Sequence, residues 1–222
     1  MELISLPGLD RLMEICRRLN LMLETSPPAS APLKGGSLLE GLPFDPMLAS
    51  VYARLGHATF ATEPLGTGWI LYRSDDEVHE LEKENERWRK KWWKELGASV
   101  IVFGGDLHTY VTVPHLADER GRQPVVRVDT YEYDPKVMPV ASNVDRFFDS
   151  YSRYLEALVS DPDYQEAGES DLLFPWHVAD ILARDERLVE LMRARRFDTL
   201  MKNVNASEAV RHWFEKVCGV PL

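Results

Sequence analysis

Three polar side chains in the middle of the chain, Asp106, His108 and His115, are of types that could do chemistry together. An Asp-x-His pair can hold a metal ion, or its carboxylate can orient a histidine that acts as a general base. A metal site needs three or four converging ligands, and Asp106 follows two glycines in a predicted turn. Loop polarity accounts for these residues more simply. We therefore predict no catalytic residue, metal site or cofactor, and keep a small metal-dependent hydrolase centred on the three residues as an alternative.

The two cysteines, Cys16 and Cys218, stand at opposite ends of the chain, each within an apolar helical pattern. No Cys-x-x-Cys or Cys/His spacing indicates a zinc site, and neither context indicates an activated thiol. We expect two reduced cysteines in packing positions, with one disulfide between the ends as the alternative. The chain also lacks a Gly-x-Ser-x-Gly nucleophile turn and a phosphate-binding loop.

A basic cluster at residues 87–94 interleaves Arg and Lys with Trp88, Trp92 and Trp93. Such a pattern can bind nucleic acid or an anionic membrane surface. Several glutamates, however, lie three or four residues before a Lys or Arg of the same predicted helix, which favours a solvated helix with paired charges. Trp88 and Trp92 then anchor this helix to the core. Trp93 is left as a candidate contact for a protein partner, because exposed tryptophan is a frequent interface anchor.

The chain has 222 residues and a formal net charge of −10. An acidic protein is repelled by phosphate backbones, so we expect no nucleic-acid partner. Acidic loops would instead steer a basic protein partner, unless the charge serves solubility alone. Loop residues carry binding more often than framework residues do. The candidate protein contacts are Trp93, Asp106, His108, Asp118 and Glu119.

The first third of the chain is predicted to be helical around a proline-rich linker. Apolar residues at helical spacing predict an amphipathic helix at 7–24. The prolines that follow Thr25 cannot continue a helix, so the chain up to residue 37 is expected to be a linker or surface loop. Asp45-Pro46 is typical of a helix start, and Gly56 fits a left-handed helix end.

Alternating or fully apolar runs predict five strands, at 57–62, 69–72, 99–103, 109–113 and 124–131. A short loop containing Asp118 and Glu119 joins the last two, which predicts hairpin neighbours. The Gly104-Gly105 pair is expected to form a turn after the third strand. Amphipathic patterns predict the remaining helices, at 75–96, 143–158, 175–183, 186–195 and 206–217. The predicted fold class is therefore α+β, an antiparallel multi-stranded sheet flanked by helices, with helical N- and C-terminal extensions.

Five segments between residues 39 and 158 follow one another in an order found in a known family. They are a Leu42-Pro43 helix opening with Leu48 and Tyr52, the strand Trp69-Ile70-Leu71-Tyr72, the strand and glycine turn at 100–106, the strand at 125–129, and the entry into the helix at 143–158, from Ala141-Ser142 to Phe147. In this order they resemble a SUKH domain, whose superfamily includes fungal cell-wall-assembly regulators and bacterial proteins that neutralise secreted toxins. The charged 75–96 helix and both terminal extensions depart from the common pattern.

The resemblance implies an α+β domain that binds rather than catalyses. In the bacterial branch it implies an immunity protein that blocks a polymorphic toxin, often a nuclease with a basic cleft, which an acidic binder would match by charge. A regulatory scaffold with several partners, as in the fungal relatives, is the alternative. We expect an N-terminal helix and linker at 1–38, a SUKH-like domain at 39–160, and a helical extension at 161–222 packed on the same domain. No signal peptide or long apolar run is present, so we expect a cytoplasmic protein without membrane contact.

Overall fold

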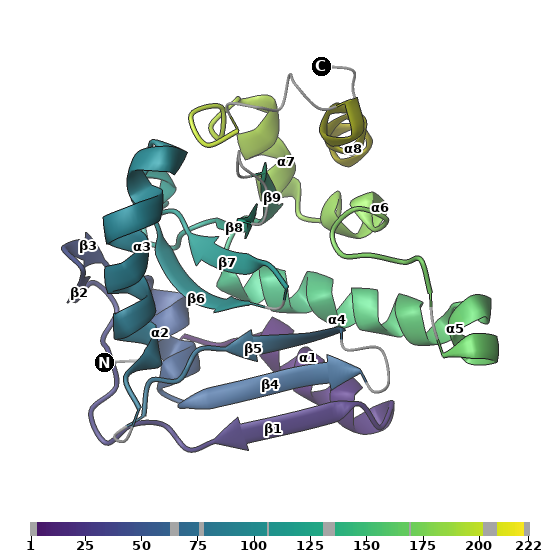
Figure 1. Ribbon diagram of the computed structural model, residues 1–222, viewed down its shortest axis with the longest axis horizontal. Coiled ribbons are helices and arrows are strands. Elements are labelled where there is room, and N and C mark those ends of the chain that lie inside the picture. The colour runs from purple at the N-terminus through teal and green to yellow at the C-terminus, as the bar shows by residue number, and fades with distance from the viewer. Residues whose placement is uncertain are drawn as a thin grey trace.

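A seven-stranded antiparallel sheet with helices packed against it forms the centre of the protein, which confirms the predicted α+β class (Figure 1). The computed structural model describes residues 4–62, 67–75, 78–105, 107–130, 136–168, 170–201 and 208–219. The strands are β1 (Met22–Ser26), β4 (His57–Thr62), β5 (Thr67–Leu71), β6 (Ile101–Gly105), β7 (Thr109–Thr112), β8 (Val125–Asp129) and β9 (Lys136–Ala141). They lie side by side in this order, so each neighbour in the sheet is the next of these strands along the chain.

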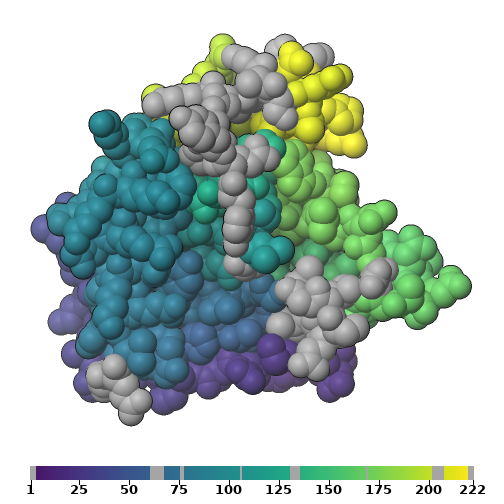
Figure 2. Space-filling view, viewed as in Figure 1, coloured from purple at the N-terminus to yellow at the C-terminus, as the bar shows by residue number. Residues whose placement is uncertain are grey.

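The helices pack on this sheet and on one another. They are α1 (Pro7–Arg18), α2 (Pro46–Tyr52), α3 (Glu80–Leu96), α4 (Val144–Ser160), α5 (Pro162–Ala167), α6 (Ala179–Leu182), α7 (Glu186–Arg193) and α8 (Glu208–Cys218). A 3-10 turn, η1 (Pro114–Leu116), follows β7, and a two-stranded hairpin joins β2 (Leu38–Leu39) to β3 (Leu42–Pro43). Helix α5 projects from one end of the molecule (Figure 2) and has no buried residue. No helix in the described part of the chain is long and apolar enough to cross a membrane.

The N-terminal segment is part of the sheet, and the expectation of a helix at 7–24 followed by a linker is wrong at its end. Helix α1 stops at Arg18, and Asn20 turns the chain with a φ of 53°. The next residues form β1, which pairs in register with β4 from Met22 to Ser26. Periodicity alone missed β1, because the five residues of this edge strand show no apolar alternation.

Helix α1 is fixed to α4 by contacts that the sequence pattern does not reveal. The amides of Gly8 and Leu9 donate to Asp145 Oδ1 over 2.8 and 3.2 Å, so a carboxylate of α4 caps α1. A Cβ on Gly8 would lie 2.1 Å from the carbonyl oxygen of Asp145, which requires glycine here. Arg11 and Arg18 both pair with Glu156 of α4. The predicted N-terminal extension is therefore joined to the central domain through its helix as well as its strand.

Asp45 starts α2 as expected, whereas Leu42-Pro43 lies in β3 and not in the helix. One carboxylate oxygen of the buried Asp45 accepts from the amides of Met47 and Leu48 over 2.7 and 2.8 Å. The other oxygen accepts from Gln123 N over 2.5 Å and so joins the helix start to the chain before β8. Burial raises the pKa of Asp45 to about 6, against the hydrogen bonds from the three amides.

The glycines predicted to turn the chain serve close packing instead. Gly56 does not have a positive φ, and a Cβ there would lie 2.3 Å from Pro27 O, at the end of β1. Gly104 and Gly105 lie inside β6 and not in a turn. A Cβ on Gly104 would lie 2.4 Å from Trp69 Cζ2 and 2.5 Å from Ile70 O. Both predictions failed because a glycine required by a neighbour cannot be told in sequence from one required by its own φ.

Aromatic side chains fill the space between the sheet and α4. The Trp69 ring of β5 lies 5.3 Å from the Phe147 ring and 5.6 Å from that of Phe148, between centroids. Tyr110 of β7 lies 5.0 Å from Phe147 in the same cluster. Helix α4 begins where the sequence predicted, because Asn143 Oδ1 accepts from Arg146 N over 3.0 Å. This aromatic layer positions β7, β8 and α4 around the cavities described below.

Helix α3 is shorter than predicted and begins at Glu80, but its apolar stripe is confirmed. Its buried residues are Leu81, Asn85, Trp88, Trp92 and Leu96. Of these, Asn85 was not expected: its Nδ2 donates to Val102 O and its Oδ1 accepts from Val102 N, over 2.8 and 2.9 Å. Strand β5 pairs only with Gly104 and Gly105 of β6, so the Asn85 amide takes the place of a strand beside Val102.

The described C-terminal helices pack on the rest of the molecule. Helix α7 contacts β9 and α8, and α6 contacts α4 and α8. The indole N–H of Trp213 in α8 donates to Pro175 O over 2.9 Å. The helix predicted at 175–183 is reduced to α6, and the predicted helix at 206–217 is described from Glu208 onward as α8.

Candidate functional site

The two histidines of the alternative metal site lie at opposite ends of β7. His108 precedes the strand and His115 lies in η1 after it, so at roughly 3.3 Å per residue the strand alone separates them by about 10 Å. His108 Nδ1 lies 3.6 Å from Asp129 Oδ1 of β8. Partial desolvation and then the charge of Arg196 lower the pKa of His115. Asp106 lies outside the described residues, and among those described no group of three or more His, Cys, Asp or Glu side chains could hold a metal ion.

Of the two acidic candidates in the loop between β7 and β8, Asp118 forms its hydrogen bonds within the loop. Asp118 Oδ1 accepts from the amides of Arg120 and Arg122 over 2.9 and 3.0 Å, and its Oδ2 accepts from Arg122 Nε over 2.6 Å. Partial burial opposes ionisation of Asp118, but the hydrogen bonds from Arg122 and Arg120 outweigh this effect. The pKa of Asp118 is therefore lower than its usual value. Asp118 therefore orders its own loop. Glu119 beside it is exposed and can meet a partner.

Trp93 is not the exposed anchor that the pattern suggested. Its ring is half-buried against the core, and its Nε1 donates to Val100 O over 3.1 Å. Trp88 and Trp92 are buried in the core as expected, and their ring centroids lie 5.8 Å apart. This hydrogen bond fixes α3 to Val100, directly before β6.

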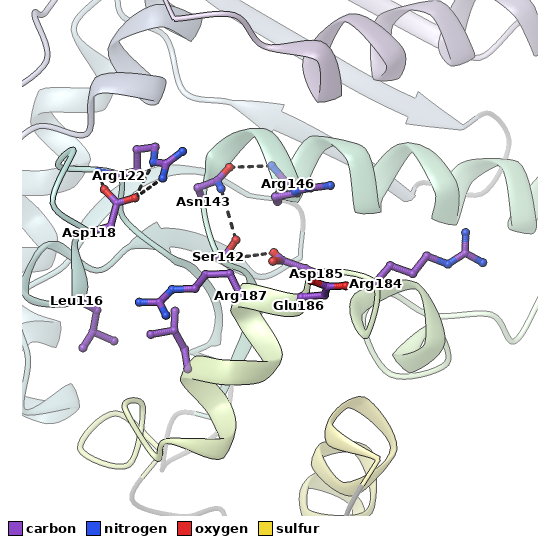
Figure 3. A pocket seen from close by; sticks show the side chains of 11 residues that line it. Leu116, Asp118, Arg122, Ser142, Asn143, Arg146, Arg184, Asp185, Glu186 and Arg187 are labelled. Carbon is purple, nitrogen blue, oxygen red and sulfur yellow. Dashed lines mark hydrogen bonds and ion pairs between the residues drawn. The ribbon is translucent and has the colours of Figure 1, made fainter.

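A polar cavity of about 520 Å³ lies where the N-termini of α4 and α7 meet, close to Asp118 (Figure 3). We call it the arginine cavity. It is lined by Leu116, Asp118, Arg122, Ser142, Asn143, Arg146, Arg184, Asp185, Glu186, Arg187 and Leu191. Four arginines at two helix N-termini would suit an anion.

Several polar groups of the arginine cavity, including Arg122 and Arg187, already have partners within the protein. Asp185 accepts from Ser142 N and Leu188 N over 2.7 and 3.1 Å, which caps α7 and joins it to the end of β9. Arg122 pairs with Asp118, and Arg187 Nη1 donates to Glu190 Oε2 over 2.9 Å. Asn143 caps α4 in the same way. These contacts assign the cavity a role in joining elements of the fold.

A second cavity, of about 250 Å³, has mainly apolar walls, and we call it the aromatic pocket. It is lined by Leu107, His108, Arg127, Asp129, Lys136, Tyr151, Tyr154, Leu173, Phe174 and Trp176. The tip of the β6–β7 hairpin, strands β8 and β9, helix α4 and the segment after α5 all contribute. Two leucines at the pocket are unusually open, since Leu107 is 70% exposed and Leu173 is 49% exposed.

Sequence reasoning placed only His108 of this pocket among the candidate residues. Arg127 of β8 was not among the candidate residues, and it is only 3% exposed. Tyr151 and Tyr154 lie in the amphipathic pattern that predicted the helix at 143–158; they are buried, and they also form a pocket wall. Leu107 and Leu173 follow no periodic pattern, so no sequence signal marks them.

Comparisons of the chain with models of protein families, with curated proteins and with solved structures found no match. The SUKH resemblance therefore remains a prediction that depends on the order of its motifs. Two structural features bear on the function: an apolar pocket with an exposed apolar rim, and two candidate histidines that do not converge.

Proposed function

We propose that this chain is a non-catalytic binding protein whose protein partner docks over the aromatic pocket. The observation that supports this most directly is the pair Leu107 and Leu173, 70% and 49% exposed, at one concave site with aromatic walls. Exposed large apolar side chains gathered at one place are typical of interaction sites. Burying a leucine side chain contributes roughly 1.5–3 kcal/mol, so two of them could anchor a complex.

The surroundings of the two leucines fit an interface with a polar rim. His108 and Asp129 lie 3.6 Å apart beside the pocket, and Lys136 follows at the start of β9. Polar groups around an apolar centre exclude water and set the orientation of the partner, while the centre supplies most of the affinity. Tyr151 and Tyr154 supply rigid aromatic walls, which lose little conformational freedom when a partner binds.

The more specific form of the proposal is an immunity protein that occludes a toxin domain. The SUKH resemblance supports it, and so does the net charge of −10. This charge would speed the encounter with a basic surface, and high salt would weaken the effect. The exposed Glu119 is a candidate for such steering. Under this proposal the chain acts in the cytoplasm, and its gene lies beside the gene of its toxin.

The test is co-expression with the C-terminal domain of a secreted protein encoded next to this chain. Leu107→Asp and Leu173→Asp should each weaken the complex by at least about 100-fold, because a carboxylate would be buried in an apolar contact. Leu38→Asp is the matched control, since Leu38 is 69% exposed but lies on the separate β2–β3 hairpin. Equal loss with Leu38→Asp, or no loss with either pocket variant, would contradict docking at this site.

A further inference from the structure

Arg127 of β8 is a buried cation, and the described residues supply few hydrogen-bond acceptors for its guanidinium group. Its side chain is 3% exposed, and it lines the aromatic pocket. Nη1 donates to the thioether sulfur of Met138 over 3.7 Å, and Nε has no hydrogen-bond partner. A thioether is a weak acceptor, whereas buried guanidinium groups are normally paired with a carboxylate or several oxygen acceptors.

The described side chains around Arg127 do not neutralise its charge, so an anion in the pocket could do so. Across the sheet its neighbours are Tyr110 on β7 and Met138 on β9. No carboxylate of the described residues forms an ion pair with Arg127. Asp129, two residues along the same strand, lies 3.6 Å from His108. Lys136 also lines the pocket.

We propose that the aromatic pocket binds a carboxylate carried on an apolar stem, with the carboxylate on Arg127 and the stem against the aromatic walls. Such a ligand would supply the acceptors that the buried guanidinium lacks, through the two parallel hydrogen bonds that an arginine can make to a carboxylate. Tyr151, Tyr154 and Phe174 would contact the stem, and Leu107 and Leu173 would cover its outer end. The stem and charge could belong to a free carboxylic acid or to a glutamate side chain of a polypeptide.

The inference concerns the chemistry of the ligand, so it can be tested without a protein partner. The probes are 4-phenylbutyrate and its neutral amide, 4-phenylbutanamide, titrated into the full chain labelled at its methionine methyl groups. The Met138 methyl is the reporter because Met138 contacts Arg127, and the other methionines are internal controls. We expect a saturable shift of the Met138 signal with the acid, and at least tenfold weaker binding of the amide.

Arg127→Met should abolish the shift with the acid while the melting temperature stays the same or rises, because an apolar side chain replaces an unpaired buried charge. Arg127→Lys should bind the acid with intermediate affinity, since lysine keeps the charge but not the planar fork. If Arg127→Met does not fold, the acid-to-amide ratio and Arg127→Lys decide the question. Equal binding of acid and amide, unchanged binding by the arginine variants, or no shift with either probe would overturn the inference.

A second pair of probes identifies the source of the carboxylate. These are the peptide acetyl-Leu-Glu-Phe-amide and its counterpart with glutamine in place of glutamate. Preference for the glutamate peptide of at least tenfold supports a polypeptide ligand, and binding of the free acid without this preference supports a small carboxylic acid. If the pocket variants lose partner binding in the co-expression test but none of these probes binds, the proposed function stands and only this inference is overturned.

Discussion

Asp45 shows how a single carboxyl group can set the pH response of this protein. It is fully buried, and it caps α2 while its second oxygen accepts from Gln123 N. Burial raises its pKa from 3.8 to about 6. Between these two values the folded protein keeps a proton that the unfolded chain releases, so folding is favoured by acid in this interval.

The contribution of Asp45 to the free energy of unfolding should fall as the pH rises from about 4 to about 6, by up to about 3 kcal/mol, and stay constant above that. Asp45→Asn cannot ionise and should remove this slope. Urea unfolding at pH 4, 5, 6 and 7 measures it, with Asp10→Asn, an exposed carboxylate of α1, as the control. The same slope in wild type and Asp45→Asn would show that another group is responsible.

At the residue scale the sequence predicted local roles well and tertiary roles poorly. The caps at Asp45 and Asn143 were predicted because a cap depends on the few residues that follow it. Arg127 was missed and Gly104 was assigned to a turn, because their neighbours, Met138 and Trp69, come from other strands. The candidate site was predicted only at His108, since pocket residues gather from five separate segments.

Asn85 is the polar side chain of α3 that bonds directly to a strand of the sheet. Asn85 bonds both backbone groups of Val102 at a point where β5 has left β6. Asn85→Ala would leave a buried amide and a buried carbonyl unsatisfied, and should lower the free energy of unfolding by about 2–5 kcal/mol. Chemical denaturation measures this, with Glu95→Ala on the exposed face of α3 as the control. A loss below about 0.5 kcal/mol, or an equal loss in the control, would contradict this role.

At the element scale, five of the seven strands and the longer helices could be predicted, since their apolar pattern reflects burial on one face. Strand β1 was missed because it is a partly exposed edge strand, and β9 because it contains Pro139. Proline is tolerated in β9 because that strand also forms an edge of the sheet. Edge strands are defined by their neighbours, so their own residues carry a weaker signal.

At the scale of the whole molecule, the cap from α4 joins the N-terminal helix to the domain. Asp145→Ala should lower the free energy of unfolding by about 1–2 kcal/mol, because the amides of Gly8 and Leu9 lose their acceptor. Amide hydrogen exchange along α1 should speed up more than exchange in β7. Asp10→Ala, in the first turn of α1 itself, is the control and should change stability by less than about 0.5 kcal/mol. Equal effects of the two variants would contradict the cap.

The central proposal, that a protein partner covers the aromatic pocket, is tested most directly by amide hydrogen exchange of the chain with and without the proposed partner, a toxin domain. The account predicts slower exchange in the complex at Leu107–Thr109 and across Leu172–Trp176, and no change at the β2–β3 hairpin. Protection confined to other surfaces, or no complex with that domain, would contradict it.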